Sequence, residues 1–351
     1  MKKILIIRPK VGFELGGAER HVAEVAIRLL QRGFQISLIA HEVSLSKEIV
    51  DQIDLYRLPL RGFGSIPKQL LFIFQAKRIL QEIHYDYIIS FYRFPWKSNL
   101  FILCDPLVSY TLHQRGSFLS LMRPRYRIML KLEKVALTEA KKVIALFSPT
   151  RNILANFYPQ ILSKTYVCHR GIDIQKFHPH LRQNRNIYRK IFNLSPKDYI
   201  ILFVGYDTKR KGLNLLLKTL PHLPSHIKLL VAGKDGTSSE RVKFLGKVKE
   251  MEKLYALADL FVLPTLYDPG AQSTLEALAS GTPVITTPFD GTSEFVIEGL
   301  NGFVVEREEK ALKEAILRAL DTPFDPYIIA STVAHLTWDN YVDCLINHLE
   351  E

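Results

Sequence analysis

The sequence predicts an α/β fold of two Rossmann-like domains that follow one another along the chain. The chain has 351 residues, which is too long for one ordinary hydrophobic core and fits two domains. Short apolar runs alternate with amphipathic stretches, a pattern typical of a parallel sheet covered by helices. The alternation begins again near residue 200, so the second half of the chain predicts a second sheet of the same kind.

The first half supplies the elements of the first sheet. A strand is expected at residues 4–7, followed by a helix at residues 18–31 that Gly33 closes. Further apolar runs of strand length lie at residues 35–40, 86–90 and 142–145. Together these elements predict a parallel sheet in the first domain.

The second half repeats this order of strands and helices. Strands are expected at residues 200–204, 227–232, 260–263 and 283–286, each near a glycine or proline. Helices are expected at residues 213–220 and 273–279. Two such sheets in tandem predict a ligand crevice at the carboxyl ends of their strands.

The boundary between the domains is expected within residues 167–179, where turn residues occur without clear periodicity. The last helix, residues 338–349, has apolar positions at helical spacing and could pack back on the first domain. The predicted domains are therefore residues 1–168 together with 336–351, and residues 169–335.

Composition and charge limit the classes of function. The net charge of +12 attracts polyanions such as nucleic acid, anionic lipid or phosphorylated substrates. No zinc pattern or RNA-binding aromatic signature accompanies this charge, so a membrane surface or a phosphate-rich acceptor is favoured over nucleic acid. The longest apolar runs, such as residues 199–204, are far too short to span a bilayer.

The three cysteines indicate little chemistry of their own. Cys104, Cys168 and Cys344 have no metal-like spacing, and so few cysteines fit a reducing cytoplasm best. We expect all three to be buried as small hydrophobic residues.

A glycine-rich turn follows the first strand. Gly16 and Gly17 stand before Ala18, Glu19 and Arg20, and such small residues let backbone amides at a helix start approach a phosphate. The spacing is not G-x-G-x-x-G, so a simple dinucleotide site is not indicated. A plain turn between strand and helix remains the alternative.

Two adjacent cations follow the strand at residues 200–204. Arg210 and Lys211 precede a helix, where they can neutralise a diphosphate leaving group and replace a metal ion in that role. The chain contains no Asp-x-Asp, so a metal-bridged diphosphate is not indicated. A solvated basic turn is the alternative interpretation.

The stretch DPGAQSTLE, residues 268–276, carries the strongest signal. Gly270 and Ala271 are expected to offer free amides at a helix start, and Asp268 lies in the loop before it. Glu276 falls on the first turns of the helix. One carboxylate can hold hydroxyls of a sugar while the other accepts hydrogen bonds from ribose hydroxyls. A surface position is the alternative for Glu276.

These motifs resemble those of the retaining glycosyltransferases of family 4, which have the GT-B fold. Residues 268–276 are similar to the family's E-x7-E motif, with Asp in the first acidic place. GGAERHV, GID with KFHP, VGYDTKRKG and WDNYVDCLINHL resemble its first loop, linker, phosphate-binding turn and returning helix. Within the family, residues 105–127 are similar to those of lipopolysaccharide core glucosyltransferases that act on inner-core heptose.

The resemblance implies a role for each matching residue. Arg210 and Lys211 would hold the donor diphosphate, and the backbone of Gly17, beside Gly16, would pack against it. Asp268 would bind hydroxyls of the transferred sugar, with the amides of Gly270 and Ala271 nearby. Glu276 would bind the ribose.

Three further assignments also rest on the resemblance. The base would be held by the backbone of the loop Leu245-Gly246-Lys247-Val248. Asp105 would be the acidic group near the reacting centre. His113 competes with it as the residue that contacts the sugar.

The resemblance thus implies transfer of a hexose, from UDP-glucose or a similar donor, to a saccharide acceptor such as lipopolysaccharide core. It implies retention of configuration and no metal or other cofactor. Two alternatives remain, and Asp in place of Glu at residue 268 suggests the first of them. One is a non-catalytic binder of sugar nucleotides, and the other is a different two-Rossmann nucleotide-sugar enzyme, such as an epimerase or a phosphorylase.

A basic amphipathic stretch, residues 118–135, suggests where the protein acts. On a helix, Arg123, Arg127, Lys131 and Lys134 share one face, and apolar residues share another. Such a helix can lie on an anionic bilayer. We therefore expect a cytoplasmic protein, peripheral at the inner face of the cytoplasmic membrane. A helix packed on its own domain with a solvated basic face is the alternative.

Overall fold

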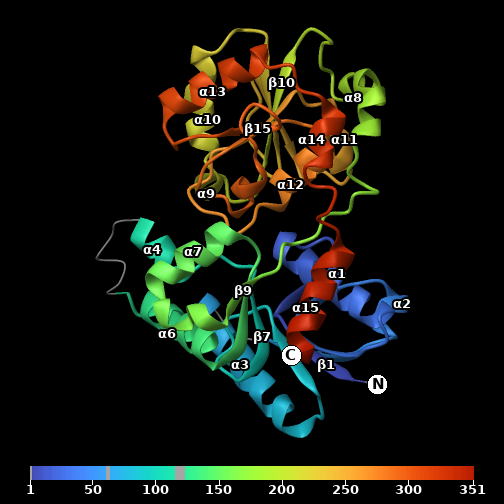
Figure 1. Cartoon of the computed structure of the whole chain (residues 1–351), viewed down its shortest axis with the longest axis vertical. Helices are drawn as coiled ribbons and strands as arrows, with labels where there is room; N and C mark the ends of the chain where they lie inside the picture. The colour runs from blue at the N-terminus through green and yellow to red at the C-terminus, as the bar shows by residue number, and fades with distance from the viewer. Residues whose placement is uncertain (1, 61–63, 115–122) are drawn as a thin grey trace. The chain divides into compact units, whose positions relative to one another are not determined.

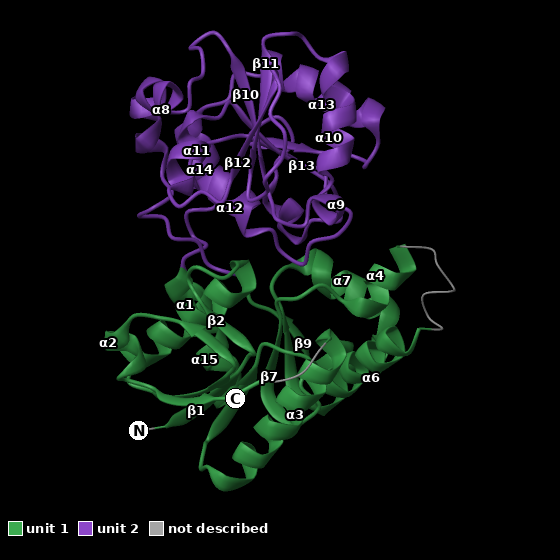
Figure 2. Ribbon diagram, turned by 180° about the vertical axis from the view of Figure 1, so that it is seen from behind, with its two compact units in different colours: residues 1–169, 338–351 green, residues 170–337 purple. Residues whose placement is uncertain are grey.

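The computed structural model describes residues 2–60, 64–114 and 123–351, which form two compact units (Figures 1 and 2). Unit 1 comprises Met1–His169 and Trp338–Glu351, and unit 2 comprises Arg170–Thr337. Each unit is an all-parallel sheet with helices packed against it. The α/β fold of Rossmann-like units that the sequence predicts is therefore confirmed.

Unit 1 is built on a seven-stranded sheet in the order β5-β3-β1-β6-β7-β8-β9. Its strands are β1 Lys3–Ile7, β3 Gln35–Ala40, β5 Asp54–Arg57, β6 Tyr87–Ser90, β7 Ser98–Leu103, β8 Ala140–Ala145 and β9 Thr165–Val167. A small pair, β2 Lys10–Gly12 and β4 Glu42–Ser44, lies beside it. Residues 4–7 of the central strand β1 are fully buried, as a strand covered on both faces requires.

The helices of unit 1 come from both ends of the chain. They are α1 Gly17–Gln31, α2 Lys47–Val50, α3 Ser65–Glu82, α4 Val108–Gln114, α6 Pro124–Glu139, α7 Ser148–Phe157 and α15 Trp338–Glu350. The last helix packs on α1 (Figure 1). There, Tyr341 Oη lies 2.8 Å from Nε2 of the buried His21. The expected return of the C-terminal helix to the first unit is thereby confirmed.

Unit 2 is built on a six-stranded sheet in the order β12-β11-β10-β13-β14-β15. Its strands are β10 Tyr199–Val204, β11 Ile227–Ala232, β12 Val242–Gly246, β13 Leu260–Leu263, β14 Val284–Thr286 and β15 Gly302–Val304. Its helices are α8 Arg185–Ile191, α9 Thr208–Lys211, α10 Leu213–Thr219, α11 Met251–Leu257, α12 Gln272–Ala279, α13 Glu309–Asp321 and α14 Pro326–Ser331. All its strands are parallel, so their carboxyl ends share one edge of the sheet.

The expectation for the cysteines was wrong for two of the three. Cys168 and Cys344 form a disulfide across 176 residues, whereas Cys104 is not disulfide-bonded and is partly buried. The sequence carries no local signal for this pairing, because the fold alone brings the end of β9 next to α15. The pair lies within unit 1.

The basic helix begins later than expected. Its described part, α6, starts at Pro124, and residues 118–122 lie outside the described residues. The four cations Arg123, Arg127, Lys131 and Lys134 are exposed. Leu132 is buried in the core of unit 1, and Ile128 packs against that core. The apolar face thus packs on its own unit, and the basic face is solvated.

A buried carboxylate ties α6 to α4. Glu133, 1% exposed, accepts hydrogen bonds from the amides of Val108 (2.5 Å) and Ser109 (3.0 Å) and from the hydroxyl of Tyr158 (3.0 Å). In glutamine, an amide NH₂ group replaces one of these acceptor oxygens, so that a donor would face another donor and lose its hydrogen bond. We therefore expect Glu133→Gln to lower the free energy of unfolding by about 2 kcal/mol, measured by urea denaturation. The control Glu139→Gln, at an exposed position of the same helix, should change it by under about 0.5 kcal/mol.

Candidate functional site

The loops at the carboxyl edge of the unit 2 sheet carry the residues with the strongest sequence signal. Arg210 and Lys211 lie on the short helix α9 that follows β10. Asp268 lies in the loop after β13, and Glu276 lies on α12, which follows that loop. Open parallel sheets bind ligands at this edge, because loops from several strands converge there.

The structure brings the paired cations onto the Asp268 carboxylate. Arg210 Nη1 donates to Asp268 Oδ2 at 2.9 Å, and Lys211 Nζ lies 3.3 Å from the same oxygen. The other carboxylate oxygen accepts a hydrogen bond from the Gly270 amide at 3.3 Å. A second guanidinium contact, to the carbonyl of Tyr267 at 2.6 Å, fixes Arg210. These two cations are therefore not a solvated turn, since both are directed at one buried anion.

This pairing controls the charge of Asp268. Burial raises the pKa of its carboxyl, but the charges of Lys211 and Arg210 outweigh burial and lower the pKa to about 2. The side chain is only 6% exposed, so water screens the pair weakly. Asp268 is therefore ionised at neutral pH and forms a compact triad with the two cations.

A second buried carboxylate stabilises the loop that carries Asp268. Asp290, fully buried after β14, accepts hydrogen bonds from the amides of Ala271 (3.3 Å) and Thr292 (3.0 Å) and from two threonine hydroxyls, Thr274 (2.8 Å) and Thr286 (3.0 Å). Its backbone also pairs with that of Asp268. Burial and the nearby charge of Asp268 raise the pKa of Asp290. Asp290 lies beyond Thr286, the last residue of β14, and its role was not predicted from the sequence.

Glu276 is buried on α12, so its interpretation as a surface residue was wrong. It is 6% exposed, and Tyr255 of α11 donates its hydroxyl to Oε2 at 2.9 Å. At the start of the same helix, the hydroxyl of Ser273 is buried and has no hydrogen-bond partner among the described residues. A buried hydroxyl without a partner costs free energy, so a bound group that pairs with it would be stabilised.

Neither the amide of Gly270 nor that of Ala271 remains open. The Gly270 amide donates to Asp268, and the Ala271 amide donates to Asp290. The expectation that they are free donors was therefore wrong, because the two acidic side chains already accept from the amides just before α12. The Ser273 hydroxyl is left as the candidate donor at this position.

The predicted base loop lies at the same edge. Gly246 is the last residue of β12, with φ +61°, and its carbonyl accepts a 2.7 Å hydrogen bond from the Gly233 amide. A side chain at Gly246 would collide with the carboxylate of Asp235. Lys247 is exposed, and Val248 is partly buried. Part of this stretch is therefore strand, and the positive φ of Gly246 explains the glycine.

The remaining predicted residues belong to unit 1. Gly16 is the N-cap of α1, and Gly17 is its exposed first residue. His113, on α4, is exposed, and its ring centroid lies 5.6 Å from that of Phe157. Asp105 follows the carboxyl end of β7.

Asp105 is held by a buried arginine that the sequence analysis missed. Arg8 directly follows β1 and donates from both terminal nitrogens to the two Asp105 oxygens, at 3.0 and 3.1 Å. It also donates to Glu19 of α1 at 3.1 Å. Burial raises the pKa of Asp105, but the charges of Arg8 and Arg93 outweigh it and lower the pKa. Asp105 is thus an ionised, fixed carboxylate.

Comparison with protein families agrees with this architecture. Residues 15–176 match the model of Glycosyltransferase Family 4, and residues 198–322 match that of Glycosyl transferases group 1. The chain is a family 4 glycosyltransferase. Its fold is GT-B, which the solved structures below share.

Relatives of this glycosyltransferase match it along most of their length. The lipopolysaccharide glucosyltransferase WaaG of Escherichia coli is 23% identical over 88% of this chain and 87% of its own. A glycosyltransferase of Methanocaldococcus jannaschii is 23% identical over 95% of this chain and 94% of its own.

Solved structures show the same fold. A crystal structure of WaaG has a TM-score of 0.80 at 20% identity and covers 97% of this chain and 95% of its own. Anabaena HepE, crystallised in complex with UDP and glucose, has a TM-score of 0.76 at 18% identity, and the match covers 100% of both chains. Among the described residues, no helix is both long and apolar enough to cross a membrane.

The interaction of Asp268 with Arg210 and Lys211 should make the free energy of unfolding depend on pH in the acid range. The pKa of Asp268 is about 2 in the folded chain and near 3.8 otherwise, so its pairing stabilises unit 2 fully above pH 4 and loses effect as the pH falls toward 2. We expect Asp268→Asn to lower the free energy of unfolding by about 2 kcal/mol at pH 6. Urea denaturation from pH 6 to 3 should show this difference shrinking, and a constant difference would contradict it.

Proposed function

We propose that this glycosyltransferase moves a hexose from a nucleoside diphosphate sugar, such as UDP-glucose, to a saccharide acceptor and retains the anomeric configuration. The observation that supports this most is the pairing of Arg210 and Lys211 on Asp268 at the carboxyl edge of unit 2. The two cations can bind the charged oxygens of a diphosphate, and the neighbouring carboxylate can accept hydrogen bonds from hydroxyls of the adjacent sugar.

The proposed chemistry is positioning and charge stabilisation. When the glycosidic bond breaks, negative charge develops on the departing diphosphate, and Arg210 and Lys211 neutralise it. Asp268 orders hydroxyls of the sugar, whose ring becomes oxocarbenium-like. The acceptor hydroxyl attacks on the face that the diphosphate leaves, and a diphosphate oxygen takes the acceptor's proton. No covalent intermediate with the protein is required.

The other residues at this edge bind the rest of the donor. Glu276, oriented by Tyr255, accepts hydrogen bonds from ribose hydroxyls. The buried Ser273 hydroxyl donates to a diphosphate oxygen. The backbone of Gly246, Lys247 and Val248 takes the base. In unit 1, Gly16 and Gly17 are the candidates for close backbone approach to a phosphate, and Asp105 and His113 are the acceptor-side candidates.

A transfer assay tests this function. Purified protein is incubated with radiolabelled UDP-glucose and a lipopolysaccharide truncated after inner-core heptose, and the product is analysed by ¹H NMR. We expect labelled glycolipid with a retained α-anomeric linkage. A protein that binds the donor but releases or transfers no sugar would be the non-catalytic binder, and an inverted linkage would contradict retention.

We propose further that transfer needs no metal, because the two cations supply the charge that a divalent ion would otherwise supply. Turnover should be the same with 5 mM EDTA as with added Mg²⁺, to within about twofold, a difference of about 0.4 kcal/mol in barrier. Loss of turnover in EDTA that Mg²⁺ or Mn²⁺ restores would contradict this proposal.

The proposed acceptor also suggests where the enzyme works. WaaG is a lipopolysaccharide glucosyltransferase, and a similar acceptor would place this enzyme at the cytoplasmic face of a membrane. The exposed cations of α6 favour peripheral attachment to such a membrane if it is anionic. Since the apolar face of α6 packs on unit 1, the attachment would be electrostatic.

Vesicle flotation tests this attachment. Changing Arg123, Arg127, Lys131 and Lys134 to Gln should lower binding to vesicles of 30% phosphatidylserine at least tenfold, because each cation near such a surface contributes about 1 kcal/mol. The matched control removes four exposed lysines of unit 2, Lys190, Lys197, Lys218 and Lys310. Equal loss in both variants would mean that net charge alone, and not α6, is responsible.

A further inference from the structure

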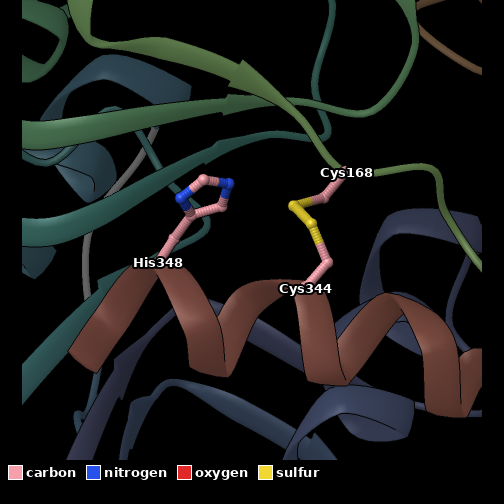
Figure 3. Close-up of side chains that lie close together, drawn as sticks. All are labelled: Cys168, Cys344 and His348. Carbon is pink, nitrogen blue, oxygen red and sulfur yellow. A yellow bond between two sulfur atoms is a disulfide. The ribbon is translucent and has the colours of Figure 1, made fainter. Parts of the chain in front are cut away.

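Two cysteines and a histidine lie together in unit 1. Cys344 and His348 are four residues apart and therefore share a face of α15, next to Cys168 at the end of β9 (Figure 3). The two cysteines are bonded, with their Cα atoms 6.0 Å apart. Both sulfur atoms and a ring nitrogen of His348 lie within 4.8 Å of one another.

The bond joins chain positions on either side of unit 2 in the sequence. Cys168 comes just before the chain enters unit 2 at Arg170, and α15 begins at Trp338, where the chain returns to unit 1. The 176-residue separation therefore encloses all of unit 2. A disulfide that closes so long a loop restricts the unfolded chain strongly.

The ion pairs between α15 and α1 are exposed. Arg32 of α1 pairs with Asp339 (3.1 Å) and Asp343 (2.7 Å), but both carboxylates are more than half exposed. Exposed ion pairs contribute little to stability. α15 also packs on α1 through buried residues, including Tyr341 against His21, and the disulfide attaches it covalently to the end of β9.

The surroundings of the two sulfur atoms differ. Cys168 is 1% exposed, whereas Cys344 is partly exposed and can be reached from solvent. The imidazole of His348 stands beside them and packs on Tyr166, with ring centroids 4.5 Å apart. An adjacent imidazole can take the proton of a thiol and so favours the reactive thiolate.

We propose that Cys168 and Cys344 form a reversible redox clasp that fixes α15 to the end of β9, with a low-molecular-weight disulfide such as oxidised glutathione as the oxidant. The Cys344 thiolate attacks one glutathione sulfur, forms a mixed disulfide and releases one glutathione thiolate. The Cys168 thiolate then attacks Cys344 Sγ and releases the second. Two protein thiols and one glutathione disulfide thus become one protein disulfide and two glutathione thiols. Disulfides of proteins in reducing compartments are usually transient or redox-sensing, which fits such a clasp.

Alkylation in glutathione buffers tests the clasp on the unmodified chain. The protein is equilibrated at ratios from fully reduced to fully oxidised glutathione, denatured in acid, alkylated and weighed by mass spectrometry. We expect three labels in the reduced form and one in the oxidised form, on Cys104, with a single transition between them. Three labels at every ratio, or a stable glutathione adduct, would overturn the proposal.

Two further measurements separate the clasp from other roles of this cluster. The oxidised chain should melt about 5 °C or more above the reduced chain, and equal melting temperatures would show that α15 is not held by the bond. His348→Gln should slow disulfide formation about tenfold at pH 7 without shifting the midpoint. If the reduced protein instead binds one equivalent of Zn²⁺ that blocks oxidation at all ratios, the cluster is a metal site and the clasp is refuted.

Discussion

Replacing both Arg210 and Lys211 with alanine is expected to lower kcat for sugar transfer by about 10²–10³, the cost typical of removing groups that stabilise a developing anion. The effect should fall on kcat more than on KM, because the leaving diphosphate carries more negative charge in the transition state than in the bound donor. Steady-state kinetics with UDP-glucose would measure it. Each single variant should lose less, since the remaining cation still faces Asp268.

A matched variant separates this effect from net charge. Lys209 and Lys218 are exposed cations on α9 and α10, and their double replacement with alanine removes the same charge. We expect that control to keep kcat within about twofold, as for surface positions in general. Unchanged kcat in the Arg210 and Lys211 variant, with the fold intact by circular dichroism, would refute the role of the pair.

Asp268→Asn is expected to have two opposite effects. Transfer should fall about 100-fold, because the carboxylate that orders the sugar is lost and each charge-assisted hydrogen bond to it contributes about 1.5–3 kcal/mol. Binding of UDP without a sugar should become tighter, by about threefold or more, because Asp268 no longer competes with the diphosphate for the two cations. Isothermal titration with UDP and kinetics with UDP-glucose would measure both.

The opposite signs make this prediction specific. A variant that is merely misfolded would lose both UDP binding and transfer. Asp268→Glu, which keeps the charge and adds one methylene, is the conservative comparison and should keep part of the transfer activity. If Asp268→Asn weakened UDP binding as much as it lowered transfer, the carboxylate would be a structural residue of the loop.

The elements of both sheets could be predicted from sequence because their signal is local. The apolar run at residues 4–7 and the amphipathic stretch at residues 18–31 reappear as β1 and α1, and those at residues 260–263 and 273–279 as β13 and α12. Short or less apolar strands such as β9 and β12 were missed, since tertiary packing stabilises them more than their own pattern does.

The candidate site was predicted less completely, because many of its contacts depend on tertiary packing and not on a local sequence pattern. Arg210, Lys211 and Asp268 stood out through their positions after strands, and the structure brings them together. Their partners could not be predicted, because each contact joins segments distant in the chain. Tyr255 on Glu276, Asp290 beneath the Asp268 loop and Arg8 on Asp105 are such contacts. The disulfide of Cys168 and Cys344 is another.

The central claim is that Arg210 and Lys211 bind the diphosphate of a nucleotide sugar, and the affinity difference between UDP and UMP measures this most directly. Both ligands carry the same base and ribose, so their ratio of Kd isolates the second phosphate. Isothermal titration should show UDP binding at least tenfold, or about 1.4 kcal/mol, tighter than UMP to the unaltered protein, and nearly equal binding to the variant with both cations replaced by alanine. A ratio that the double replacement leaves unchanged would contradict the account.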